Sequence, residues 1–314
     1  MRRTTSHLIV VTALLVAVQA AVGAGTASAS GPGYLTLLMG RTQWVQVNAK
    51  CLPYAGAVPL DQVAQALHDR GVNPTGTVVV DRTQEAVRSC FGNYTLMPSW
   101  ADLATLRDQY GWSFVSSGMT HNNITVMTPE QQRAESCGSL PYFAAHGHDR
   151  AWGLFAYGGN RWNTTVQENV VSTCFAYGRT YKGGRNDQAS MVYPWFQRTN
   201  SIDGGLCNDP GQPCYTYQLK TTKRYRSPNY LANLMNVGGD QWVIIQMYRF
   251  VIGSQLNTNK AFRWDCASSD WRQHWTSHVE LYCLDDYLSA VDRIPDGVIV
   301  TDPATVAEAW GRTL

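Results

Sequence analysis

Hydrophobic and polar positions along the chain follow two periods, one typical of strands and the other of helices. Short apolar runs bounded by turn residues, such as TVVV at 77–80, predict buried strands. Apolar residues three and four positions apart, as in PLDQVAQALHDRG, predict amphipathic helices. Strands are expected at 44–47, 77–80, 112–118, 152–158, 241–253 and 297–301. Helices are expected at 59–71, 99–111, 128–140, 165–174, 279–294 and 302–312.

Capping residues support these helix boundaries. Ser99 precedes one helical pattern and Gly111 ends it, while Thr128 and Pro129 open another. The stretch 183–235 is rich in Gly, Asn, Asp and Tyr and is expected to form long loops. Alternating strands and helices predict an α/β fold with a mainly parallel sheet, in a single domain over 30–314.

The first 29 residues predict a secretory signal peptide. Arg2 and Arg3 form a basic start, an apolar run follows from Leu8 to Val22, and Ala27-Ser28-Ala29 is a small-residue cleavage site. Beyond residue 29 no apolar run approaches the roughly 20 residues that a membrane-spanning helix needs. The mature protein is therefore expected to be secreted and to have no membrane span.

Charge and composition narrow the expected partners. Without Arg2 and Arg3 the chain has 23 basic and 23 acidic residues, in no basic stripe, which argues against nucleic acid as a partner. The 11 Trp and 16 Tyr include enough aromatic rings to stack on sugars outside the core. A monomeric chain is expected.

Eight cysteines follow the signal peptide, and an even number in an oxidising compartment indicates disulfides. Cys207 and Cys214 bracket the turn sequence NDPGQP, so this pair is expected first. Sequence order favours Cys51–Cys90, Cys137–Cys174 and Cys266–Cys283 for the others, although other pairings remain open.

One stretch resembles a known family. SWADLATLRDQYGWSFVSSGMTHNNITVMTPEQQRAE, followed by LFAYGG, resembles the polysaccharide deacetylases of the NodB-homology type, carbohydrate esterase family four. QWVIIQMYRFV and GVIVTDPATVAEAW are similar to its late strand and its ending. The resemblance implies a distorted β/α barrel. It also implies a polysaccharide or oligosaccharide substrate, from which acetyl groups are removed with the help of a divalent metal, usually zinc or cobalt, held by one Asp and two His.

The metal ligands of the family are largely missing here. His121 in SSGMTH matches the second metal histidine, and Ser117 occupies the place of the first. The resemblance places an Asp-Asp pair on the first strand, expected near 45–51, where Asn48 and Lys50 stand without a carboxylate. One imidazole and a hydroxyl would bind a divalent metal weakly, so a zinc cofactor is doubtful.

The catalytic positions of the family are also altered. In FAYGG, Tyr157 is kept, whereas Gly158 and Gly159 replace the Pro and the Tyr whose backbone amide holds the oxyanion. Tyr248 stands where the late catalytic histidine is expected. The resulting candidates for catalysis are His121, Asp81, Tyr157 and Tyr248. The candidates for substrate binding are Ser117, Asn122, Asn160 and Trp162.

Other polar residues have simpler explanations. Asp81 follows a strand, and capping of the next turn explains it as well as catalysis does. His146 and His148 are expected in a solvated loop. A rival metal set is His274 and His278, four apart, with acidic residues at Asp265, Asp270 and Glu280. Asp285 and Asp286 suit a solvated helix face.

Three functions stay open. The chain is either an esterase acting on acetylated extracellular or cell-wall polysaccharide, or a non-catalytic carbohydrate-binding pseudoenzyme with the same fold. The third alternative is a metal-independent glycoside hydrolase with two carboxylates, for which Asp81 and Asp240 are the candidates.

Overall fold

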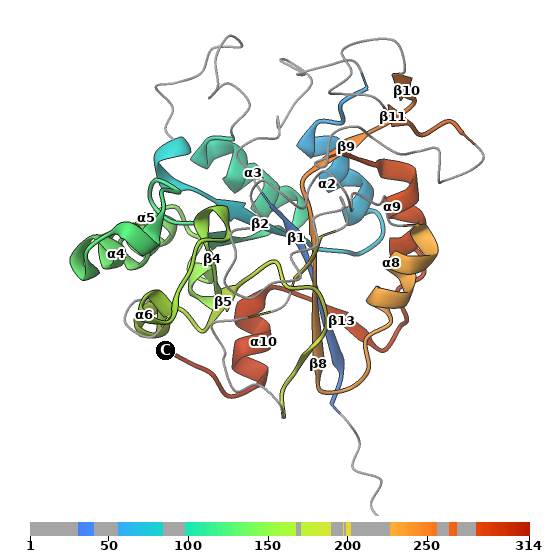
Figure 1. The fold of residues 1–314 in the computed structure, drawn as a ribbon. Coiled ribbons are helices and arrows are strands. Elements are labelled where there is room, and N and C mark those ends of the chain that lie inside the picture. Colours follow the sequence, from blue (N-terminus) through green and yellow to red (C-terminus); the bar gives the residue numbers. More distant parts are fainter. Residues whose placement is uncertain are drawn as a thin grey trace, which may run out of the picture. The chain divides into compact units, whose positions relative to one another are not determined.

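A computed structural model describes the chain over 31–40, 56–83, 98–167, 171–189, 197, 199–201, 227–255, 264–268 and 281–314 (Figure 1). The chain divides into two compact units, Met1–Gly31 and Pro32–Leu314, and the fold below is that of the second. The expected signal peptide and the expected strand at 44–47 lie outside the described residues.

A curled, mainly parallel sheet forms the centre of the fold (Figure 1). Its strands are β1 (Gly33–Met39), β2 (Thr75–Val78), β3 (Ser113–Ser116), β4 (Leu154–Ala156), β5 (Tyr177–Arg179), β6 (Asn186–Asp187), β7 (Thr199–Ser201), β8 (Gln241–Met247) and β13 (Val298–Val300). The order is β5-β4-β3-β2-β1-β8-β6, with β13 also on β1 and β7 also on β8. Among the described strands of this sheet, only β6 pairs antiparallel.

Residues in and just before β7 contact both β8 and β5, the strand at one end of the sheet. Thr199 to Ser201 pair with β8, and Gln197 forms a parallel bridge with Arg179 of β5. The Gln197 amide donates to the Gly178 carbonyl, and the Thr180 amide donates to the Gln197 carbonyl. These bonds place the carboxyl ends of β5 and β8 near one another.

Several helices begin at the expected capping residues. They are α2 (Leu60–His68), α3 (Trp100–Tyr110), α4 (Pro129–Glu135), α5 (Leu140–Ala145), α6 (Thr164–Val166), α7 (Ser172–Cys174), α8 (Pro228–Met235), α9 (Leu284–Val291) and α10 (Pro303–Ala309). Ser99 and Asp102 form a capping box on α3, and Thr128 and Gln131 form another on α4. Gly111 ends α3 in the left-handed conformation, with φ of 69°.

Some elements differ from the sequence-based expectation. β1 is an inner strand that pairs with β2, β8 and β13, yet it lies ahead of the first expected strand. The expected loop region 183–235 contains α8, whose N-cap is Ser227. The expected helix 279–294 begins as the short strand β12 (Leu281–Cys283), which pairs with β9 (Arg249–Val251). A second small sheet joins β10 (Ser254–Gln255) to β11 (Trp264–Asp265).

The two faces of β1 enter different apolar clusters, as strand alternation requires. Leu35, Leu37 and Met39 pack in the larger cluster, which includes side chains of α2, α3, α8 and α9. Tyr34 and Leu38 face the smaller one, together with Trp242 of β8 and residues of α10. The rings of Tyr34, Tyr177 and Trp242 all contact Trp310, just after α10. Aromatic packing therefore fills the amino ends of the strands.

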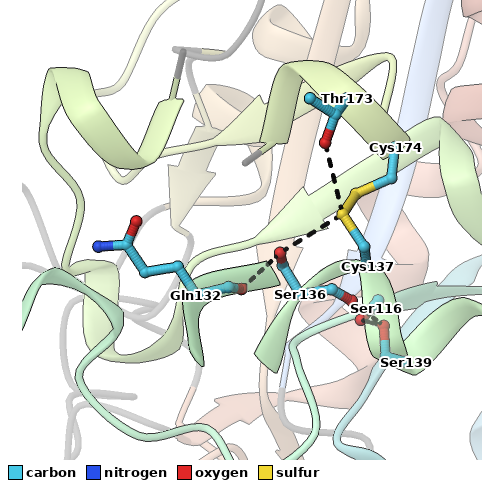
Figure 2. The surroundings of a disulfide bond; sticks show 7 residues. All are labelled: Ser116, Gln132, Ser136, Cys137, Ser139, Thr173 and Cys174. Atoms are coloured by element: carbon cyan, nitrogen blue, oxygen red, sulfur yellow. Dashed lines mark hydrogen bonds between the residues drawn. A yellow bond between two sulfur atoms is a disulfide. The ribbon is translucent and has the colours of Figure 1, made fainter. Parts of the chain in front are cut away.

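Both of the expected disulfides within the described residues are formed, Cys137–Cys174 and Cys266–Cys283. The expected pairs Cys51–Cys90 and Cys207–Cys214 lie outside those residues. Cys137–Cys174 joins the short 3-10 helix η6 (Cys137–Ser139) to α7 across a sequence separation of 37, so it should contribute about 3–4 kcal/mol to stability. Figure 2 shows its polar surroundings.

A buried hydroxyl network next to this disulfide connects η6 to the end of β3. The hydroxyls of Ser116 and Ser139 are 2.6 Å apart (Figure 2), and Ser139 Oγ donates to the Ser136 carbonyl. The Gly118 amide in turn donates to Ser116 Oγ. The disulfide thus fixes the element against which the loop after β3 folds.

Across the described part of the chain, no helix combines the length and the apolar character that a membrane crossing requires.

Candidate functional site

His121 lies in the loop that follows the carboxyl end of β3, and Ser117 directly follows this strand. Ser117 Oγ donates to the Ala156 carbonyl at 2.8 Å and is 3.0 Å from His121 Nδ1. On the other side of the imidazole, the Gly159 amide donates to His121 Nε2 at 3.3 Å. The structure therefore brings Ser117, His121 and the FAYGG segment together.

These contacts define the tautomer of the imidazole. Nε2 accepts from a backbone N–H, so the proton of the neutral ring is on Nδ1. The Ser117 hydroxyl uses its hydrogen on Ala156, so it can accept the Nδ1–H of His121. Consequently His121 does not act as a base toward Ser117, and this pair is not an activated nucleophile.

The loop around His121 depends on Glu135, the last residue of α4. This carboxylate accepts from the amide and hydroxyl of Thr120 and from the amide of His121, at 2.8 to 3.1 Å. Its side chain is only 6% exposed, and burial raises its pKa although these hydrogen bonds oppose the shift. Sequence reasoning missed Glu135, because nothing in TPEQQRAE separates a buried carboxylate from an exposed one.

Two residues near the site have left-handed backbone conformations, which glycine adopts most readily. φ is 65° at His121 and 54° at Asn160. Gly158 permits the close contact between the loop of His121 and the loop of Asn160, because a Cβ at Gly158 would lie 3.0 Å from the His121 carbonyl oxygen. Such strain at a pair of apposed loops is common at functional sites.

The side chains present do not fit the divalent metal that the resemblance implies. The metal requires an Asp-Asp pair on the first strand of the sheet. β1, the first strand described, instead ends in Leu38 and Met39, whose side chains are fully buried in apolar clusters. The expected location at 45–51 lies outside the described residues. His121 Nε2 already accepts from Gly159, the amide that the resemblance assigns to the oxyanion. Throughout the described ranges, no three His, Cys, Asp or Glu residues group as metal ligands.

The two carboxylates proposed for a glycosidase lie at opposite ends of the sheet. Asp81 is exposed in the 3-10 helix η3 (Val80–Arg82), just past the carboxyl end of β2. Asp240 immediately precedes the amino end of β8, in a left-handed turn with φ of 58°. β2 and β8 both run parallel to β1, so the length of β8 alone separates the two by roughly 20 Å. The pair cannot serve the two-carboxylate mechanism.

Of the remaining expected site residues, Tyr157, Trp162 and Asn122 lie apart from the polar groups, whereas Asn160 contacts them. Tyr157 is buried beside Phe155 in an apolar cluster, where desolvation raises its pKa well above the usual value, and Trp162 packs on this cluster. Asn122 is exposed beside the His121 loop. Asn160, in the 3-10 helix η8 (Gly158–Asn160), accepts from the Tyr181 amide at 3.1 Å.

Tyr248 belongs to a polar cluster that sequence reasoning only partly found. Its hydroxyl hydrogen-bonds the Tyr181 hydroxyl, to which Gln246 Nε2 donates at 3.0 Å. The Arg179 guanidinium lies 4.4 Å from the centre of the Tyr181 ring. Gln246 and Arg179 lie at the carboxyl ends of their strands. The sequence signal that could have identified Gln246 is its position as a polar residue within the apolar run QWVIIQM.

The histidines of AAHGHDR were both expected in a solvated loop, which is wrong for His148 only. His146 is exposed and stacks on Trp100 at 4.3 Å, whereas His148 is buried between Trp100, Phe114 and Phe143.

In the rival metal set, His274, His278, Asp270 and Glu280 lie outside the described residues. Asp265 accepts from the Ala267 amide. Asp285 and Asp286 lie in the first turn of α9.

The fold is that of the polysaccharide deacetylases of the NodB type. A candidate polysaccharide deacetylase from Mycobacterium smegmatis matches with a TM-score of 0.50 and 11% identity, over 91% of this chain and 92% of that one. A family 4 carbohydrate esterase from Streptomyces lividans in complex with acetate matches at 0.43 and 11%, over 87% and 95%. A family 4 pseudoenzyme from Bacillus anthracis matches at 0.38 and 10%, over 68% of this chain and 55% of that one.

No family model matches the chain, and no curated protein matches its sequence. The resemblance seen in the sequence is thus confirmed at the level of the fold, for which the Mycobacterium structure is the evidence. Identity this low does not extend to activity.

Proposed function

We propose that the chain is an exported carbohydrate-binding protein that keeps the NodB-type barrel without metal-dependent deacetylation. The observation behind this proposal is the carboxyl edge of the sheet, the end at which α/β sites gather. There, imidazole, amide, hydroxyl and aromatic groups stand in place of metal-binding carboxylates. They belong to His121, Asn160, Tyr181, Gln246 and Tyr248.

These groups suit a sugar better than an acyl-transfer reaction. Hydroxyls of a saccharide both donate and accept hydrogen bonds, as amide and phenol side chains do, and tyrosine rings can pack on the apolar face of a pyranose. The Mycobacterium structure of the same fold is described as a candidate polysaccharide deacetylase, which supports a polysaccharide as the ligand class.

Calorimetric titration with acetylated chitin and xylan oligosaccharides tests this proposal. We expect binding that is equal in EDTA and in zinc, since no step of recognition uses a metal. His121→Ala should weaken it at least fivefold, and His146→Ala, an exposed imidazole stacked on Trp100, should leave it unchanged. Absence of affinity for every glycan in the wild-type protein would refute the proposal.

A further inference from the structure

Arg179 is a buried cation at the carboxyl end of β5. The residue is 4% exposed, and its Nε and Nη1 have no hydrogen-bond partner among the described residues. It also forms no ion pair within those residues. Guanidinium groups are rarely buried in this way without a carboxylate or phosphate partner.

The protein groups around Arg179 compensate only part of its charge. The Tyr181 ring, 4.4 Å away, provides a cation–π contact, which is weaker than the desolvation cost of an unpaired guanidinium. Burial raises the pKa of the Tyr181 phenol, but the charge of Arg179 and hydrogen bonds from Tyr248, Gln246 and Arg179 itself outweigh it and lower the pKa overall. The surroundings of Arg179 therefore favour a negative group.

An unpartnered acceptor lies in the same cluster. Gln246 is fully buried, and its Nε2 donates to the Tyr181 hydroxyl while its Oε1 has no partner among the described residues. The Gln246 amide packs closely against Gly40, where an added Cβ would lie only 2.6 Å from Gln246 Nε2, so the side chain has little room to move. The cluster therefore offers cationic N–H donors on one side of Tyr181 and an amide oxygen at its hydroxyl.

We propose that Arg179 and Gln246 bind a sugar acid, the carboxylate accepting from Arg179 and a ring hydroxyl donating to Gln246. A ligand that satisfies both must have an anionic group and hydroxyls on one small frame, as a uronic acid has. This inference rests on the proposed carbohydrate-binding function and identifies the ligand as an acidic, uronate-containing polysaccharide.

Calorimetry with the full, disulfide-bonded chain tests the inference. The probes are oligomers of galacturonic, glucuronic and mannuronic acid, each beside its methyl ester, together with a sulfated and a neutral chitin oligosaccharide. We expect at least one uronate oligomer to bind ten or more times tighter than its ester. Arg179→Gln should remove this preference, whereas Arg133→Gln, an exposed arginine on α4, should keep it. Gln246→Leu should weaken the acid and the ester by a similar factor.

The outcomes separate this inference from the proposed function. If neutral glycans bind and no uronate is preferred to its ester, the acidic site is refuted while carbohydrate binding stands. A preference for sulfate alone, or equal losses in Arg133→Gln and Arg179→Gln, refutes it as well. If no glycan binds, the proposed function has failed. The wild-type comparison of acid with ester decides the matter even if a variant does not fold.

Discussion

Replacing Glu135 by alanine should lower the free energy of unfolding by about 2–4 kcal/mol. The carboxylate accepts from the amides of Thr120 and His121 and from the Thr120 hydroxyl in a nearly buried position. Without it, two backbone N–H groups next to a left-handed His121 lose their acceptor. The loop should also lose the orientation of the imidazole, so affinity for glycans should fall together with stability. Urea unfolding of the wild type and the variant measures the change.

Two variants on the same helix complete this experiment. Glu130→Ala removes an exposed glutamate from the first turn of α4 and should have a small effect. Glu135→Gln keeps the size and one acceptor oxygen, so it should be less destabilised than Glu135→Ala. If alanine at 135 proves no more harmful than alanine at 130, then Glu135 does not hold the His121 loop.

Lowering the pH from 7 to 4 should cost about 3 kcal/mol of stability through His148 alone. Burial is the main reason that the pKa of His148 falls from 6.5 to about 4, and Arg107 and His146 lower it further, while Asp108 and Asp149 raise it. A lowered histidine pKa means that the unfolded chain binds the proton more tightly than the folded one. Stability is therefore complete above pH 6.5 and declines as the pH falls toward 4.

Replacing His148 by phenylalanine isolates this contribution. The imidazole lies between Trp100, Phe114 and Phe143, and its Nε2 has no hydrogen-bond partner among the described residues. An aromatic ring that cannot be protonated should flatten the stability curve between pH 6.5 and 4. His146→Gln, at the exposed neighbour, removes only one of the smaller contributions to the lowered pKa of His148, so it should keep most of the wild-type slope. A slope in His148→Phe equal to that of the wild type would assign the acid sensitivity to other groups.

Buried Glu135 contributes in the opposite direction. Its pKa is raised above 4.5, mainly by burial, so the folded state binds the proton more tightly than the unfolded state. Its contribution is complete below pH 4.5 and is lost as the pH rises through the folded-state pKa. Comparison of Glu135→Gln with His148→Phe therefore separates two slopes of opposite sign in the acid range.

Local signals predicted much of the fold. The caps at Ser99 and Thr128 and the glycine stop at Gly111 have direct physical causes in a few neighbouring residues, and α3 and α4 begin where they indicate. β1 was missed, although GYLTLLM is strongly apolar. Both faces of this strand are buried, so it has none of the alternation that identifies a half-exposed strand. β12 was missed because pairing with β9, a tertiary contact, decides its conformation.

The site was predictable only where a motif places residues together. SSGMTH and FAYGG do meet, through Ser117, His121 and Gly159. Arg179 was not found, because its significance arises from burial and missing partners, which a sequence does not reveal. Asp81 and Asp240 looked like a pair until the strand directions placed them at opposite ends of the sheet.

Release of acetate is the measurement that bears most directly on the central claim, a deacetylase fold without its metal chemistry. Acetylated chitin and xylan oligosaccharides are incubated with the purified chain in EDTA and in saturating zinc or cobalt, and free acetate is measured together with bound metal. We predict no acetate above the uncatalysed rate under any condition, and no stoichiometric metal. Metal-dependent acetate release that is lost in His121→Ala would contradict the account.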